Sequence, residues 1–224
     1  ESLVSITLPE GLTTIRYGAF RDCTSLTSII IPESVTSIGG YAFRFCTSLA
    51  KFEGPLATSD QRCIVIDGAL VAFAPAELFE YVIPEGVTEI GVDAFCDCTS
   101  LASITLPEGV TEIGNNTFAG CTSLASITLP EGLTTIGAWA FSDCRSLTSI
   151  TLPKGVTTIG ERAFYNCTSL KSVYCKPITP PTGGWNMFDS NASGRKIYVP
   201  ADSVDAYKAA EYWEEYAPDI VAEE

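Results

Sequence analysis

The sequence predicts a repeat solenoid, in which a right-handed coil of parallel β-strands carries short helical turns and ends in a C-terminal helical cap. The first observation is a 23-residue period, since residues 101–110 (LASITLPEGV) return as 124–133 (LASITLPEGL) and 147–156 (LTSITLPKGV). The second is that leucine opens successive repeats, at Leu3, Leu26, Leu49, Leu78, Leu101, Leu124, Leu147 and Leu170. Proline and phenylalanine keep the same register, at Pro9, Pro32, Pro84, Pro107, Pro130 and Pro153 and at Phe20, Phe43, Phe95, Phe118, Phe141 and Phe164.

Residues 1–224 are expected to form a single solenoid, because a stacked array has one continuous core. Two repeats occupy 1–48, and a longer repeat with a β-hairpin insert occupies 49–77. Four regular repeats follow over 78–169, and degenerate repeats with the cap fill 170–224. The chain opens at a repeat boundary without a cap, so we expect a leader or further repeats before Glu1.

Each repeat begins with a short strand. Residues 103–106 (SITL) alternate polar and apolar side chains, so Ile104 and Leu106 are expected to point inward. Equivalent strands one coil apart should pair in parallel at ~4.8 Å. Pro107 ends the strand, and the Pro-Glu-Gly run predicts a β-turn with proline second and glycine fourth.

The rest of the repeat returns across the core. Gly114 bends the chain, and residues 117–121 are predicted to form a brief helical turn that carries Phe118 inward. Arg16 stands at the bend position of the first repeat, so we expect this position to tolerate a side chain.

Two segments depart from the regular repeat. Asp67-Gly68 lies between the β-prone runs 63–66 and 69–73, which predicts a hairpin projecting from one edge of the stack. Near the end, residues 196–200 repeat the strand-then-proline pattern and predict a ninth, degenerate coil.

The C-terminal segment is predicted to close the open end of the stack. Residues 203–216 are expected to form one or two short helices that lay Val204, Tyr207 and Trp213 over the core, with Asp202 or Ser203 as N-cap. The preceding residues 176–186 are rich in proline and glycine and predict a loop.

Six of the nine cysteines occupy one position of the repeat, namely Cys23, Cys46, Cys98, Cys121, Cys144 and Cys167. Neighbours would lie ~5 Å apart at Cα, which permits a disulfide by distance, but their parallel side chains hold the Cβ atoms too far apart. We therefore expect a reduced, buried ladder, with Cys175 also in the core. Cys96 and Cys63 have no partner in register, and Cys96-Asp97-Cys98 does not converge as a zinc site requires.

Composition narrows the classes of partner and activity. The formal net charge is −14, which disfavours nucleic acid, and no apolar run reaches the ~18 residues that a membrane span needs. The chain has no histidine, so the commonest general base is absent. We expect no catalytic residues, no cofactor and no metal. The glutamates that recur in the turns after the strands are expected to be a solvated edge that keeps the stack soluble.

Candidate binding residues are those that break the pattern of small surface side chains. The position two before each phenylalanine holds Tyr41 and Trp139, and Arg44 and Tyr165 lie three residues past that position in their turns. Tyrosine, tryptophan and arginine dominate binding hot spots, although these rings can also merely pack across neighbouring turns. The hairpin turn at Asp67-Gly68 is a second candidate, because loops inserted in one repeat often form a binding face.

The repeat L-x-x-I-x-L-P-x-x-V-x-x-I-G-x-x-A-F-x-x-C resembles the BspA-type leucine-rich repeat of surface proteins from oral and gut anaerobic bacteria. Residues 78–169 carry it almost unbroken, and the long repeat and the ending 197–207 also resemble that family. The resemblance implies an exported, non-enzymatic module at the cell surface or outside the cell that contacts host proteins or other cells. Two alternatives stay open: a carbohydrate-binding surface using Tyr41, Trp139 or Tyr165, and a spacer for another domain.

Overall fold

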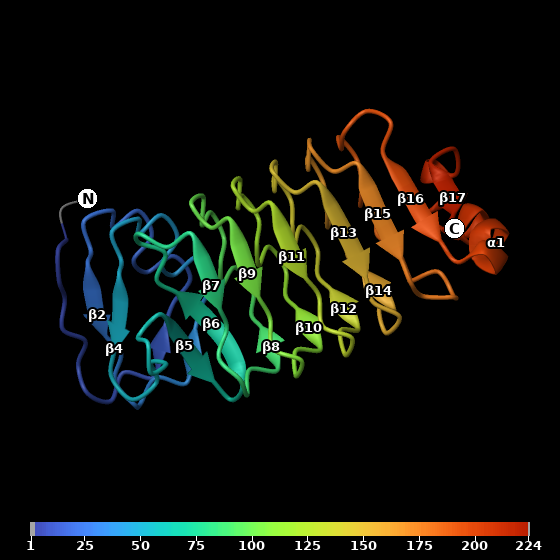
Figure 1. The fold of residues 1–224 in the computed structure, drawn as a ribbon. Coiled ribbons are helices and arrows are strands. Elements are labelled where there is room, and N and C mark those ends of the chain that lie inside the picture. Colours follow the sequence, from blue (N-terminus) through green and yellow to red (C-terminus); the bar gives the residue numbers. More distant parts are fainter. Residues whose placement is uncertain (1–2, 224) are drawn as a thin grey trace.

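The chain forms an elongated parallel β-solenoid of about nine turns that ends in a short helix (Figure 1). The computed structural model describes residues 3–223, so the expectation about the segment before Glu1 lies outside the described residues. The strands are β1 (Thr14–Ile15), β2 (Ser28–Ile30), β3 (Ser37–Ile38), β4 (Lys51–Glu53), β5 (Cys63–Ile66), β6 (Ala69–Phe73), β7 (Glu80–Val82), β8 (Glu89–Ile90), β9 (Ser103–Thr105), β10 (Glu112–Ile113), β11 (Ser126–Thr128), β12 (Thr135–Ile136), β13 (Ser149–Leu152), β14 (Thr158–Ile159), β15 (Ser172–Cys175), β16 (Lys196–Val199) and β17 (Ile220–Ala222). The helices are α1 (Val204–Ala209) and the 3₁₀ turns η1 (Ala201–Ser203) and η2 (Glu214–Tyr216).

Strands that open the repeats pair in parallel with their equivalents one coil away, as predicted, within the groups β2–β4, β7–β9–β11 and β13–β15–β16. Ser103 of β9 lies opposite Ser126 of β11, and β13, β15, β16 and β17 continue the same side of the solenoid. A second parallel ladder joins β6 to the two-residue strands β8, β10, β12 and β14. The sequence did not reveal this second ladder, because two residues are too few to show alternation.

A column of stacked phenylalanine rings fills the core, as the register predicts. Five rings follow one another with centroids 5.1–5.3 Å apart and planes within 20° of parallel, in the order Phe95, Phe118, Phe141, Phe164 and Phe188. None of these side chains is exposed. Burial of aromatic rings is among the largest sources of stability in a core, so this column is a main contributor to the stack.

The β-turn after each strand lies one residue later than predicted. The Val110 N–H donates to the Pro107 carbonyl oxygen at 3.1 Å, so proline is the first residue of the turn and Gly109 the third. The third position is the one at which type II turns take a positive φ. Gly11 and Gly86 do so in their coils, with φ of 84° and 90°.

The predicted helical turn around Phe118 is wrong: residues 114–121 form consecutive β-turns. The N–H groups of Ala119 and Cys121 close turns onto Asn116 and Phe118, whereas the Phe118 N–H donates across to Ala140 of the next coil. A helix would keep these donors within the segment. Asn116 and Gly120 also have positive φ, which a right-handed helix excludes.

Close contact between coils requires glycine at the bend position. The expectation from Arg16 that this position tolerates a side chain is therefore wrong for coils that follow another coil. A Cβ on Gly160 would lie 2.3 Å from the Ala138 nitrogen and 2.5 Å from the Gly137 carbonyl carbon of the preceding coil. A Cβ on Gly184 would lie 2.2 Å from the Glu161 nitrogen, and one on Gly114 would lie 2.8 Å from the Val92 nitrogen. Arg16 lies in the first described coil, where the described residues place no coil on that side.

Substitution of Gly160 by alanine should destabilise the protein by about 1–3 kcal/mol, because the clash is with backbone and cannot be relieved by a rotamer change. The matched control is Gly132→Ala, whose new Cβ would lie 3.5 Å from its nearest neighbour, the Glu108 carbonyl oxygen. Urea melts of the two variants measure the difference. Equal loss in both would mean that the bend does not set the coil spacing.

The cysteine ladder is a column of free thiols, buried at every ladder position except the partly exposed Cys23. The Sγ–H groups of Cys121, Cys144 and Cys167 donate to a phenylalanine carbonyl of the preceding coil at 3.1–3.2 Å, and Cys46 does so at 3.0 Å. Burial raises the pKa of Cys167 to about 12, which keeps it in the thiol form that can donate. All nine cysteines are free, and Cys175 lies in the core opposite Leu152.

Native protein at pH 8 should resist iodoacetamide at the buried ladder positions, because the thiolate is the reactive form and burial disfavours it. The partly exposed Cys23 should react first, whereas burial raises the pKa of the Cys96 thiol and should protect it as at the ladder positions. After unfolding without reductant, all nine should be alkylated. Mass spectrometry reads both results, and a set of blocked, bridged ladder cysteines would contradict the free-thiol column.

The predicted hairpin is present, but it does not project. Asp67 and Gly68 have φ of 50° and 83°, as a two-residue type I′ turn requires, and they join antiparallel β5 and β6. β6 then pairs in parallel with β8, and Ile64 and Leu70 are fully buried. The hairpin is therefore part of the stack, because both of its faces carry apolar side chains that need cover.

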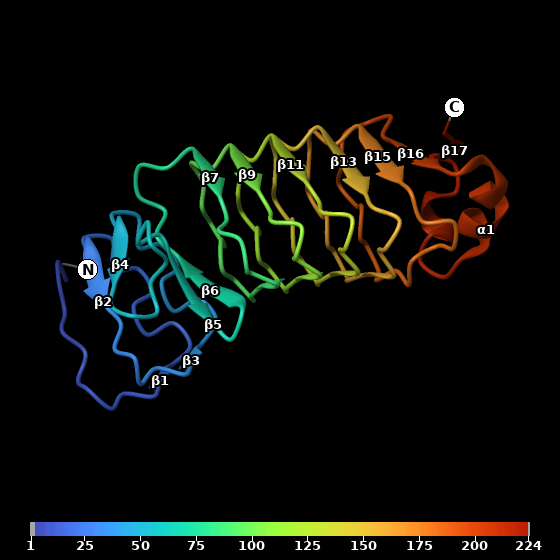
Figure 2. The same cartoon turned by 60° about the horizontal axis from the view of Figure 1, so that its bottom comes forward.

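The long coil (49–77) interrupts both the core and the surface of the stack. Described residues pair β4 with β2 and β7 with β9, and no pairing joins β4 to β7 (Figure 2). The buried residues form two clusters, one before and one after the hairpin, and β5 and β6 contribute to both. This coil also lacks the turn segment that carries phenylalanine and cysteine in the others.

The C-terminal segment closes the stack much as predicted. Tyr207 and Trp213 are fully buried, and they donate hydrogen bonds to the carbonyl oxygens of Pro177 and Pro181. Ser203 holds the N-cap position of α1, but its side chain makes no capping hydrogen bond. β17, which the sequence analysis missed, extends the sheet beside β16.

Candidate functional site

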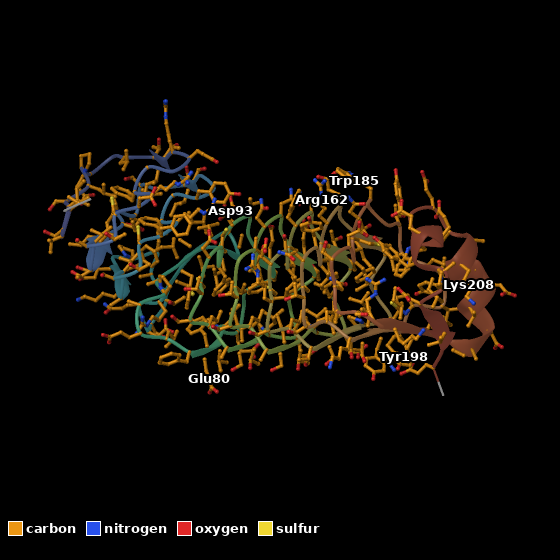
Figure 3. All side chains as sticks on the ribbon, turned by 90° about the horizontal axis from the view of Figure 1, so that it is seen from above. Glu80, Asp93, Arg162, Trp185, Tyr198 and Lys208 are labelled. Carbon is orange, nitrogen blue, oxygen red and sulfur yellow. The ribbon has the colours of Figure 1, made fainter. Side chains whose placement is uncertain are left out.

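The turn segments line one side of the solenoid, which we call the turn face (residues 16–23, 39–46, 91–98, 114–121, 137–144, 160–167 and 184–190). Figure 3 shows Asp93, Arg162 and Trp185 on this side and Glu80 and Tyr198 of the opening strands on the opposite side. The position two before each phenylalanine is left-handed in every one of these segments, with φ of 51–62° at Gly18, Tyr41, Asp93, Asn116, Trp139, Arg162 and Asn186. In the sequence, glycine, aspartate and asparagine at this position indicate a left-handed backbone, because these residue types adopt it most readily.

We number the coils from the N-terminus, so that the long coil (49–77) is coil 3 and the four regular coils over 78–169 are coils 4 to 7. Four side chains on coils 6 to 8 form a C-terminal aromatic cluster, consisting of Trp139, Arg162, Tyr165 and Trp185. The Arg162 guanidinium lies between two indoles, with its Cζ 4.6 Å from the Trp139 ring centroid and 3.8 Å from that of Trp185. Trp139 and Tyr165 meet edge to face at 6.0 Å. Cation–π contacts of this kind hold all three rings around one charge.

Glu161 fixes the orientation of both indoles. The Trp139 Nε1–H donates to one carboxylate oxygen at 3.2 Å, and the Trp185 Nε1–H donates to the other. Trp185 remains 40% exposed. Sequence reasoning named Trp139 and Tyr165 but missed Trp185, because it follows a proline-rich loop in a degenerate coil.

An N-terminal aromatic cluster occupies the turn face of coils 1 and 2. Tyr41 meets Tyr17 edge to face at 5.3 Å, and the Arg44 Cζ lies 4.6 Å from the Tyr41 ring centroid and 4.7 Å from that of Phe45. Arg44 Nε donates to Asp97 Oδ2 at 2.5 Å. The rings of both clusters thus pack across neighbouring turns and are also partly exposed, so they have defined positions on the surface.

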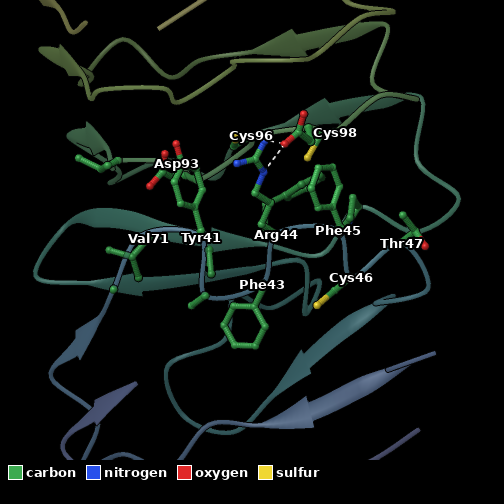
Figure 4. Close-up of a pocket in the computed structure, with 18 residues that line it drawn as sticks. Tyr41, Phe43, Arg44, Phe45, Cys46, Thr47, Val71, Asp93, Cys96 and Cys98 are labelled. Carbon is green, nitrogen blue, oxygen red and sulfur yellow. Dashed lines mark hydrogen bonds and ion pairs between the residues drawn. The ribbon is translucent and has the colours of Figure 1, made fainter. Parts of the chain in front are cut away.

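Arg44 and Asp97 span the place where coil 3 has no turn segment (Figure 4). A cavity of about 40 Å³ lies between the turn segments of coils 2 and 4. In the other turn segments up to coil 7 the phenylalanine N–H donates to the next coil, as from Phe20 to Ala42. Among the described residues the Phe43 N–H has no such acceptor, so the turn ladder is open here.

Asp93 points its carboxylate into this gap. Its Oδ1 is buried without a hydrogen-bond partner among the described residues. Burial raises the pKa of Asp93 to about 6, and donors on Asn116 and Tyr41 and the charge of Arg44 oppose this rise only in part. Burial, followed by the nearby Asp93 charge, also raises the pKa of Tyr41 to about 12.

The raised pKa of Asp93 makes stability depend on pH. An unfolded aspartate titrates near pH ~3.9, so between about pH 4 and 6 the folded protein binds more protons than the unfolded chain. Stability should therefore fall as pH rises through this window. Asp93→Asn should raise the melting temperature at pH 7 and reduce this slope.

Thermal melts from pH 4 to 7 test this, and asparagine suits the left-handed backbone because Asn116 and Asn186 occupy the equivalent position. The control is Asp205→Asn on α1, where the slope should stay unchanged. A parallel pH profile in Asp93→Asn and the parent would show that Asp93 does not control it.

A recess of about 360 Å³ separates the two aromatic clusters on the turn face. Tyr41 and Arg44 line one end and Trp139 the other, while the small side chains of coil 5, such as Ala119, form its floor. The recess thus contains three of the residues that the sequence analysis singled out. Its shape could not be foreseen, because it depends on which coils lie side by side.

The hairpin turn Asp67-Gly68 lies elsewhere. The Gly68 carbonyl accepts from the Thr88 N–H at 2.9 Å, and Asp67 is exposed. None of the ring or ion-pair contacts of the two aromatic clusters involves either residue. The structure therefore does not join this second candidate to the turn face.

Within residues 3–223 no group of histidine, cysteine and carboxylate side chains could hold a metal ion. Over the same range, no helix has the length and apolar character needed to cross a bilayer. The glutamates of the β-turns, such as Glu108 and Glu131, are exposed as expected.

The stacked coils with inward leucine, isoleucine and phenylalanine define a leucine-rich-repeat solenoid. The chain belongs to the BspA type leucine rich repeat family, whose pattern matches residues 1–61 and 70–200 in six copies. The unmatched residues between these ranges hold β5 and the Asp67-Gly68 turn. Searching curated proteins gives no match.

Solved structures of bacterial leucine-rich proteins share this fold. A leucine rich cell surface protein from Faecalibacterium prausnitzii is 24% identical with a TM-score of 0.67, over 94% of this chain and 63% of that one. The pneumococcal vaccine antigen PcpA is 22% identical with a TM-score of 0.67, over 96% of this chain and 60% of that one. A leucine-rich repeat protein from Bacteroides ovatus is 26% identical with a TM-score of 0.57, over 99% of this chain and 66% of that one. The chain thus spans about three fifths of the first two.

Proposed function

We propose that this chain is an exported, non-enzymatic interaction module that binds a protein partner, in adhesion or host contact, through the C-terminal aromatic cluster of its turn face. The fold supports an interaction role, because solenoids present extended surfaces. The names of the related cell surface protein and vaccine antigen support a location outside the cell.

The observation that carries the proposal is the fixed, partly exposed group of Trp139, Arg162, Tyr165 and Trp185. Tryptophan, tyrosine and arginine are the residue types that dominate hot spots. Glu161 and the guanidinium hold the rings in place before a partner arrives, so binding loses less conformational entropy. The same contacts stabilise the packing of neighbouring turns, and they leave Trp185 40% exposed for a partner.

The absence of histidine supports the proposal that the module is not an enzyme, because histidine is the commonest acid–base group in catalysis. The repeated coils also give equivalent carboxylates similar surroundings, whereas catalysis needs carboxylates with separated pKa values. A spacer role needs no anchor residues at all, and the aromatic cluster therefore favours binding.

The proposal predicts that Trp185→Ala weakens binding at least tenfold in an immobilised panel of host extracellular-matrix and serum proteins, because it removes the most exposed anchor. The matched control is Tyr198→Ala, which removes a ring stacked on Tyr174 at 4.8 Å on the opposite side of the solenoid. Biolayer interferometry with the strongest panel protein gives both affinities.

Thermal melts confirm that each variant is folded. Retention of no panel protein by the parent chain would favour the spacer. Equal loss of affinity in Trp185→Ala and Tyr198→Ala would remove the turn face as the contact surface.

A further inference from the structure

We propose that the turn-face recess is a binding site for a short neutral glycan, with Trp139 as the platform on which a sugar ring stacks. This goes beyond the protein contact proposed above and uses a different part of the surface: the recess lies on the opposite side of Trp139 from Arg162 and Trp185. The two sites share one ring but present different faces of it.

The depth of the recess comes from differences in side-chain size between neighbouring coils. Coil 5 has Asn116, Ala119 and Gly120 where coil 2 has Tyr41, Arg44 and Phe45. Coil 6 then raises Trp139 at the far end. The recess is open to solvent, and its volume of about 360 Å³ is at the lower end of the ~300–1,000 Å³ found for small-molecule sites, which suits one or two sugar rings.

Trp139 has one face available for stacking. Arg162 of coil 7 covers one face with its Cζ 4.6 Å from the ring centroid, and Glu161 holds the indole N–H. Trp139 also lines the recess together with Asn116, Ala119 and Gly120 of coil 5, the neighbouring coil on the other side from Arg162. The negative face of an aromatic ring attracts the weakly positive C–H groups of a pyranose, and a pinned ring pays little entropy to do so.

Polar groups beside this face can bind sugar hydroxyls, each of which both donates and accepts a hydrogen bond. The Asn116 amide offers both functions, Asp143 offers an acceptor and Arg145 offers donors. Asp143 Oδ1 is held by Asn166 at 2.6 Å and by Arg145 at 2.8 Å, so this carboxylate is already oriented. Oriented planar groups favour ligands with adjacent hydroxyls over apolar ones.

The charges of the recess select a neutral ligand. Its lining has two cations, Arg44 and Arg145, and two anions, Asp97 and Asp143, which gives a net charge of zero. They are already paired, Arg44 with Asp97 at 2.5 Å and Arg145 with Asp143 at 2.8 Å. No free cation therefore remains in the lining for a sialylated or sulfated sugar, and the net charge of −14 on the chain repels one.

The test fills the recess without disturbing the fold. Ala119→Arg places a long side chain on its floor, and the backbone accepts arginine there because Arg21 and Arg44 occupy the equivalent position in coils 1 and 2. Trp139→Asn removes the platform, and Asn116 shows that asparagine fits this left-handed position, with φ of 54° against 60° at Trp139. Thr128→Arg adds the same charge on exposed β11 and is the control.

The parent chain is screened on an array of neutral oligosaccharides printed beside their sialylated and sulfated counterparts. The strongest neutral ligand is then titrated by calorimetry. We expect neutral glycans to be preferred, affinity to fall at least tenfold in Ala119→Arg and in Trp139→Asn, and affinity to stay within threefold in Thr128→Arg and in Trp185→Ala. The last variant separates this site from the protein contact.

Three results would overturn the proposal: no neutral glycan retained, stronger binding of the acidic counterparts, or unchanged affinity in Ala119→Arg with the fold intact by thermal melt. A further result would also overturn the proposal. If a protein partner stripped of its glycans by enzymes still lost affinity for Ala119→Arg, the recess would be a binding site for protein.

Discussion

Close approach of backbone to backbone at the bend glycines is the constraint on which the rest of this solenoid depends. A Cβ at Gly137, Gly160 or Gly184 would overlap main-chain atoms of the coil before it, so the coils can lie at strand spacing only if glycine is present. That spacing places the phenylalanine rings at 5.1–5.3 Å and brings each cysteine thiol within reach of a carbonyl one coil away. Core, hydrogen bonds and thiol column follow from one contact repeated along the axis.

The same regularity makes departures from it informative. The turn face is flat where small residues recur. Larger side chains replace them at Tyr41, Arg44, Trp139, Arg162 and Trp185, and a recess lies between the two groups. These side chains satisfy one another across coils, through Asp97 at one end and Glu161 at the other. The scaffold therefore holds these side chains in defined positions without any of them belonging to the core.

The sequence was sufficient for the features that one period repeats. The parallel strands, the phenylalanine column and the existence of the hairpin follow from register and from the Asp-Gly pair. The placement of the hairpin within the stack does not, because it depends on β6 pairing with β8 rather than on local pattern. Likewise, aromatic residues out of register pointed to the turn face, but the bridge from Arg44 to Asp97 joins residues 53 positions apart and needs the missing turn of coil 3 to exist.

The break at coil 3 has a mechanical consequence. Between regular coils, tension along the long axis passes through strand ladders and a continuous core. Between coils 2 and 4 the turn ladder is open, and the hairpin, the Arg44–Asp97 ion pair and the contact of Tyr41 with Asp93 carry it. Coils with paired strands thus lie on both sides of a joint that has fewer connections. A chain stretched between a support and a bound ligand would yield first at this joint, and the coils holding Trp139 and Trp185 would keep their shape under load.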